Sequence, residues 1–108
     1  MEGGITLKGY YTNFVHLGGD VVVNKRDIVG IFDIKLSIKS KTTKKFLKTC
    51  NDEGFVSKIT EEETRSFVIV NIKGKNNEIK KDSKCSSLIV YFSPISSLTL
   101  QKRAYSSY

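Results

Sequence analysis

Two runs of consecutive apolar residues constrain the fold of this chain more than any other feature. Residues 67–70 and 88–92 are apolar or aromatic at every position. Neighbouring side chains of a strand point to opposite faces of a sheet, so strands of this kind are buried on both faces. We therefore expect two central strands, joined by a hairpin in the polar segment 74–87, with a covering layer on each side of the sheet.

Shorter segments extend this sheet. Residues 14–17 and 21–23 flank a Gly-Gly-Asp break, and glycines supply the positive φ angles that a tight antiparallel hairpin requires. A third strand is predicted at residues 28–34 and a short one at residues 55–59. The pattern indicates five or six strands, most of them antiparallel.

The first of two short helices is predicted at residues 41–52. Thr42 or Thr43 can cap its start. Its apolar side recurs at helical spacing, and the opposite side is rich in lysine. The apolar side consists of Phe46, Leu47 and Cys50.

The second helix lies at the C-terminus and has the clearest start signal. Ser93 is a favourable N-cap, and Pro94 suits the first helical position. The helix is expected to run through Ala104, with Lys102 and Arg103 near its end, where cations suit the helix dipole.

The apolar residues of this last helix fall on two sides. Ile95, Leu98 and Tyr105 share one side, whereas Leu100 and Ala104 lie nearly opposite them. Two apolar sides suggest two neighbours, so we take Leu100 and Ala104 as candidate oligomer contacts.

These elements define an α+β fold. A chain of 108 residues suits a single domain, which we place at residues 13–108, after an N-terminal extension at residues 1–12 that we expect to be flexible. Two modest helices cannot cover both faces of the sheet. Either the N-terminal hairpin folds over as a second layer or another copy of the chain covers the rest, and we expect some of both.

The charge favours polyanionic partners over small-molecule chemistry. Eighteen Lys and Arg against 11 Asp and Glu give a formal net charge of +7. Catalytic motifs and metal-ligand spacings are absent from the sequence, and His16 stands alone in an apolar strand. We therefore predict a protein that is not an enzyme and binds neither a metal nor another cofactor.

Location is inferred from the cysteines and from the start of the chain. Cys50 and Cys85 do not form a C-x-x-C pair, so two ordinary thiols in a reducing cytoplasm are expected. The sequence has neither a signal-peptide pattern nor an apolar run long enough to span a bilayer. The basic helix is short with a small apolar side, so we expect no membrane partner.

Four segments carry a family likeness: FVHLGGDVVV, DIVGIFD, TRSFVIV and YFSPISSLTLQKRA. Over about residues 14–104 the chain resembles the RemA/RemB family of extracellular matrix regulatory proteins, and within it the RemB type. The lysine-rich insertion at about residues 74–86 is longer than the family pattern. The resemblance implies a bacterial regulator of biofilm matrix genes that binds double-stranded DNA as a homo-oligomer.

The resemblance also implies where DNA is contacted. Arg26, in the turn before DIVGIFD, matches an arginine that RemA-type proteins use for DNA, and Lys25 adjoins it. Before TRSFVIV, RemA-type members carry two arginines for DNA, but this chain has Glu62 and Glu63 there, followed by Arg65. Carboxylates would repel phosphates at that position.

A third basic surface is predicted from composition alone. Residues 34–60 contain seven lysines but only two acidic residues. Lys44, Lys45 and Lys48 would form one helix face that either is simply solvated or contacts phosphates without sequence specificity. Two hypotheses therefore stand: a DNA-binding regulator led by Arg26, and an oligomeric interaction module that works with a RemA-like partner and contacts DNA little.

Overall fold

The two apolar runs form the centre of a four-stranded sheet. The computed structural model describes residues 13–72 and 87–105, and in it β5 (Ser66–Asn71) pairs antiparallel with β6 (Leu88–Ser93). β3 (Ile28–Asp33) lies antiparallel outside β5, and the short β4 (Val56–Lys58) lies parallel to β6. The predicted central strands are confirmed, and the turn between them lies outside the described residues.

Both faces of the sheet are buried, as the apolar runs predicted. Along β5, Val68 and Val70 point into one hydrophobic cluster, and Phe67 and Ile69 point into another. This alternation is the two-residue period of a strand. All four side chains are less than a tenth exposed.

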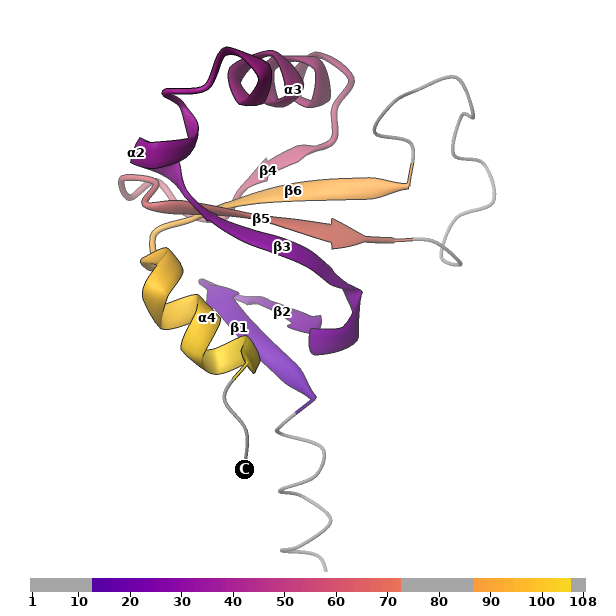
Figure 1. Cartoon of the computed structure of the whole chain (residues 1–108). Coiled ribbons are helices and arrows are strands. Elements are labelled where there is room, and N and C mark those ends of the chain that lie inside the picture. The colour runs from indigo at the N-terminus through magenta and orange to yellow at the C-terminus, as the bar shows by residue number, and fades with distance from the viewer. Residues whose placement is uncertain (1–12, 73–86, 106–108) are drawn as a thin grey trace, which may run out of the picture.

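The first face is covered by the N-terminal hairpin and the last helix (Figure 1). β1 (Phe14–Gly18) and β2 (Val21–Asn24) form a separate two-stranded sheet, and α4 (Ser97–Tyr105) packs beside β1. Gly18 and Gly19 have φ angles of 121° and 52°, which only glycine adopts readily. The expectation that the hairpin folds over as a second layer is confirmed.

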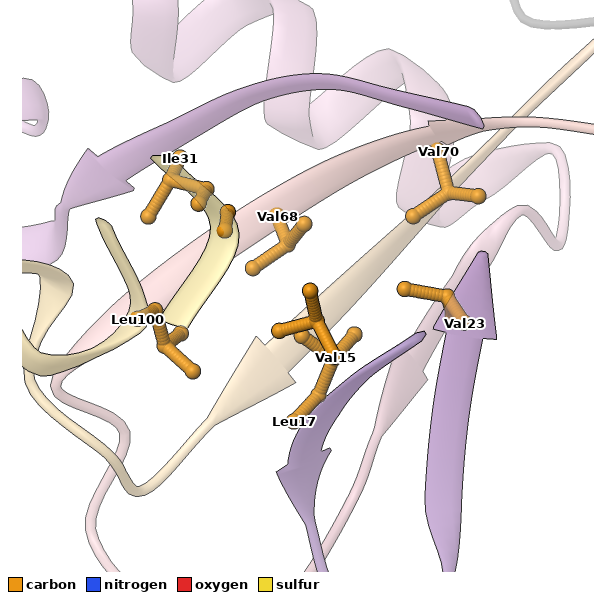
Figure 2. Packing of buried hydrophobic residues seen from close by; sticks show 8 residues of the cluster. Val15, Leu17, Val23, Ile31, Val68, Val70 and Leu100 are labelled. Atoms are coloured by element: carbon orange, nitrogen blue, oxygen red, sulfur yellow. The ribbon is translucent and has the colours of Figure 1, made fainter. Parts of the chain in front are cut away.

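Figure 2 shows the side chains that join these layers. Val15, Leu17 and Val23 from the hairpin meet Val68 of the sheet and Leu100 of α4. Leu17 and Leu100 are completely buried, so the hairpin and the helix together seal this side of the sheet.

The second face is covered by α3 (Lys41–Asp52), which lies across the sheet from the hairpin (Figure 1). Leu47 and Cys50 are its buried residues. The cap is neither Thr42 nor Thr43, because the Ser40 hydroxyl accepts a hydrogen bond of 3.2 Å from the Thr43 amide. The predicted bounds of the helix are confirmed, but its N-cap is Ser40, the residue directly before the helix.

A short helix that the sequence analysis did not predict connects β3 to α3. In α2 (Ile34–Ser37), the Asp33 carboxylate caps the first turn by accepting from the Leu36 amide at 3.0 Å. The strand therefore ends at Asp33 rather than at Ile34.

Two buried serines tie the sheet to its covering layer. The Ser93 hydroxyl donates to the Leu17 carbonyl at 2.6 Å, and the Ser66 hydroxyl donates to the Ile95 carbonyl at 2.8 Å. Ser93 is thus the last residue of β6, and α4 begins only at Ser97. The prediction that Ser93 caps the helix is wrong: Ser96 takes that role, accepting from the Thr99 amide at 3.2 Å.

The predicted α+β class, with the last helix at the C-terminus, is confirmed. The described residues contain six strands in two sheets and three α-helices, against two helices predicted. Cys50 is disulfide-bonded, so the expectation of an ordinary thiol there is wrong. Cys85, the extension 1–12 and the insertion 74–86 lie outside the described residues.

Candidate nucleic-acid interface

The basic turn is the 3₁₀ segment Lys25–Asp27 between β2 and β3. Two hydrogen bonds fix its backbone: the Asn24 side chain accepts from the Arg26 amide at 3.0 Å, and the Lys25 amide donates to the Asn13 carbonyl at 2.7 Å. Arg26 is exposed and Lys25 is half-buried, and both line a shallow hollow with the two asparagines. The guanidinium is therefore presented to solvent from an ordered backbone.

Arg65 lies at the other end of β3. Its backbone is held by a bond of 2.8 Å from its amide to the Ser93 carbonyl and one of 3.1 Å from the Ile34 amide to its own carbonyl. At one end of the β3–β5 pair, Asp33 is opposite Ser66, the residue after Arg65. At the other end, Ile28, which follows Arg26 by two residues, is opposite Val70. Five strand steps separate these ends, or about 17 Å.

The α3 lysines occupy a third region. Lys44, Lys45 and Lys48 are exposed on α3, the helix that covers the second face of the sheet (Figure 1). Lys48 forms an ion pair with Asp52, with 3.2 Å between Nζ and Oδ2. One chain therefore does not gather the three predicted basic groups into a single surface.

The residues of the acidic segment, Glu61 to Glu63, are also exposed. Lys58 orders this loop through its backbone, since its ammonium donates to the carbonyls of Thr60 at 3.0 Å and Glu62 at 2.7 Å. The Glu62 amide in turn donates to the Thr60 hydroxyl at 3.2 Å. The carboxylates are thus free of the bonds that hold the loop.

Glu63 shares a small polar cleft with Arg65. The cleft is lined by residues of both charge signs from the loop, the end of β3, the start of α2 and the residue before α4: Asp33, Ile34, Lys35, Glu63, Thr64, Arg65 and Ser96. A phosphate that approached Arg65 here would also meet Glu63 and Asp33. Arg65 therefore shares its surroundings with carboxylates, whereas Arg26 lines its hollow with Lys25 and two asparagines.

The candidate oligomer contacts on α4 have a different role in the structure. Leu100 and Ala104 are completely buried in the chain's own core, so they are not available to a second copy. Leu98 and Tyr105 are 63% and 61% exposed. The sequence pattern identified two apolar sides but assigned the core to the wrong one, because periodicity alone does not say which side faces the sheet.

Two residues near these surfaces were not assigned a role from sequence. Asn24 was read only as part of a polar break, although an asparagine directly before a turn is a recognised capping signal. Lys58 was counted among the lysines, and its role in ordering the acidic loop has no signal in the sequence. Arg103, in contrast, bonds the His16 carbonyl at 2.8 Å and so joins α4 to β1.

Metal clusters and membrane-spanning helices were also sought among residues 13–72 and 87–105. Within residues 13–72 and 87–105, His, Cys, Asp and Glu do not gather in threes around a possible metal position. His16 places Nε2 at 2.7 Å from the Gly19 carbonyl, which is a contact of the hairpin turn. No helix in the same part of the chain is both long and apolar enough to cross a membrane.

The fold and its surface define a class of small α+β domain that presents basic groups from a fixed turn and from one helix. The RemA-like family, described as "Extracellular matrix regulatory protein A-like", matches residues 14–104. The chain is 35% identical over 91 residues to Extracellular matrix regulatory protein B of Bacillus subtilis (strain 168), covering 84% of this chain and 89% of that protein. The chain belongs to the RemA-like family.

Proposed function

We propose that this protein is a non-enzymatic regulator that binds duplex DNA in the cytoplasm and controls genes for the extracellular matrix of a biofilm. The observation that carries the proposal is the exposed Arg26 on a turn whose backbone is fixed by two hydrogen bonds. A guanidinium held in this way loses little conformational freedom when it pairs with a phosphate. The regulatory role is taken from the name of the B. subtilis relative, Extracellular matrix regulatory protein B.

The charge distribution supports binding mainly through phosphates. The formal net charge is +7, and Arg26 and the α3 lysines belong to different parts of the surface. Contacts of this kind position a protein on DNA and give an affinity that falls steeply with salt. A homo-oligomer would repeat the basic turn along the duplex and add these contacts together.

The test is fluorescence anisotropy of a labelled duplex with purified protein between about 50 and about 200 mM salt. Arg26→Ala is expected to weaken binding at every salt concentration and to reduce the slope of log affinity against log salt by about one contact. Lys102→Ala removes one exposed positive charge from α4 and serves as the matched control, with a smaller expected loss. If a folded Arg26→Ala protein binds the duplex with unchanged affinity, Arg26 does not contact DNA.

The exposed Glu61 to Glu63 loop favours a second candidate function. In this alternative the protein is an oligomeric interaction module that assembles with a RemA-like partner and contacts DNA little. This second candidate function predicts a stable oligomer whose affinity for DNA is weak and nonspecific. Tight binding to DNA at physiological salt would reject this alternative.

A further inference from the structure

The segment from α2 through α3 carries nearly all of the excess positive charge of the chain. Residues 34–51 contain six lysines and no Asp or Glu, which gives a local charge of +6 against +7 for the whole chain. All six side chains are exposed, and together they form what we call the lysine surface: Lys35, Lys39, Lys41, Lys44, Lys45 and Lys48. Like charges at this density attract a polyanion rather than a single small anion.

Four of these lysines lie on the side of α3 that points away from the sheet. Lys41, Lys44, Lys45 and Lys48 are separated by three or four residues, which places them on one face of the helix. This face is opposite the buried side of α3 that packs on the sheet. It extends for about 10 Å along the helix, a length over which one strand of duplex DNA presents about three phosphates.

The carboxylates that flank the lysine surface leave most of it unpaired. The Asp33 carboxylate, before α2, accepts from the Leu36 amide at 3.0 Å. At the end of α3, Asp52 pairs with Lys48, with 3.2 Å between Nζ and Oδ2. Both side chains of this ion pair are exposed, so water screens it and it contributes little. A phosphate can therefore replace Asp52 beside Lys48.

α3 and the basic turn lie on opposite sides of the central sheet (Figure 1). α3 covers the second face, so its outward side lies about 10 Å beyond the sheet, the width of one helix. The basic turn instead connects β2, in the hairpin on the first face, to β3. A straight duplex seated on Arg26 therefore leaves the lysine surface open to another polyanion.

We propose that the lysine surface binds a second DNA duplex, so that the protein bridges two DNA segments. This inference rests on the proposed function, because the first segment occupies the basic turn at Arg26. Arg26 offers one guanidinium on a fixed backbone, whereas lysines offer ammonium groups on flexible stems, which meet phosphates as point charges. Such contacts do not depend on the bases, so the second segment is held whatever its sequence.

A two-duplex capture assay on the full-length chain tests the bridge. A biotinylated duplex is held on streptavidin beads, and a fluorescent duplex of unrelated sequence is free in solution. The unaltered chain should retain the fluorescent duplex on the beads, and less of it as the salt rises from about 50 to about 200 mM. Fluorescence anisotropy with one labelled duplex measures binding of a single segment in parallel.

Lys41→Gln/Lys44→Gln/Lys45→Gln removes three charges from the lysine surface. Because three phosphate contacts are lost, this variant should retain at least about tenfold less of the second duplex. Its affinity for a single duplex should stay within about twofold of the unaltered chain, since the basic turn is intact. The matched control, Lys41→Arg/Lys44→Arg/Lys45→Arg, keeps the three charges and should capture like the unaltered chain. Circular dichroism confirms the fold of each variant.

Four results would overturn the bridge. The unaltered chain binds one duplex but retains no second one; the Gln variant captures as well as the unaltered chain; the Gln variant loses single-duplex affinity as strongly as capture; or the Arg variant loses capture like the Gln variant. Binding to anionic phospholipid vesicles without capture of a second duplex would assign the lysine surface to a membrane instead. Failure of the proposed function would appear separately, as an unaltered chain that does not bind a single labelled duplex.

Discussion

The two faces of the central sheet are covered in different ways. On the first face, a two-stranded sheet and α4 bury Leu17 and Leu100 completely, and buried serines add hydrogen bonds between the layers. On the second face, a single helix, α3, lies across the sheet and buries Leu47 and Cys50. The first face also carries the basic turn, which connects β2 to β3, so the position of Arg26 depends on the hairpin layer.

Mutations under the two faces should therefore differ in their effect on the basic turn. A change that loosens the first face displaces the hairpin and with it the basic turn. A change of similar chemistry under α3 should lower stability while leaving the turn in place.

Leu100→Ala should be the most damaging. The variant removes a completely buried side chain from the junction of hairpin, sheet and α4, and should lower the free energy of unfolding by about 3 to 5 kcal/mol. Urea denaturation followed by circular dichroism measures this. Leu98→Ala on the same helix is the control, because Leu98 is 63% exposed and should change stability little. Equal losses in both would contradict the assignment of the core side.

Leu47→Ala should cost less, about 2 to 3 kcal/mol, because the residue lies under a single helix and is not fully buried. The same denaturation experiment measures the loss. At temperatures where the variant is folded, its affinity for labelled duplex should equal that of the unaltered chain. A loss of DNA affinity larger than that of Leu100→Ala would mean that the second face, not the first, positions the basic turn.

Ser93→Ala should lower the free energy of unfolding by about 1 to 3 kcal/mol, because it leaves the buried Leu17 carbonyl without its donor. The Ser93 hydroxyl also accepts from the Ile95 amide at 3.0 Å, so two polar groups lose a partner. Ser66→Ala, which removes one bond, is expected to cost less. Amide hydrogen exchange in β1 should accelerate more in Ser93→Ala; equal exchange in both variants would reject Ser93 as the link to the hairpin.

Ser40→Ala should have the smallest effect of the four, about 1 kcal/mol, because it removes the N-cap of α3. Thermal unfolding by circular dichroism measures the loss. Thr42→Ala is the control and also tests the cap that the sequence suggested, since Thr42 is exposed within the first turn. A larger loss of stability in Thr42→Ala than in Ser40→Ala would mean that Thr42, not Ser40, caps the helix.

Local signals in the sequence were enough for most of the secondary structure. The consecutive apolar residues 67–70 required burial on both sides, and the Gly-Gly break required a hairpin. The bounds of α3 followed from helical spacing of Phe46, Leu47 and Cys50. Each of these patterns depends on neighbours within a few residues, which is the range over which sequence reports structure directly.

The errors came from contacts between distant residues. Ser93 satisfied the rules for a helix cap, but its hydroxyl bonds the carbonyl of Leu17, which is remote in sequence. Ser93 therefore remains the last residue of β6, and Ser96 caps the helix. Leu100 was assigned to an outer surface because a helix with two apolar sides does not reveal which side meets the core.

The same division applies to the candidate site. The excess of positive charge, the turn that holds Arg26 and the acidic run before β5 could be read from the sequence. The position of Arg26 and Arg65 at opposite ends of the β3–β5 pair could not, because strand register converts a separation along the chain into a distance in space. Charge can be counted from a sequence, but which charges meet depends on how the strands pair.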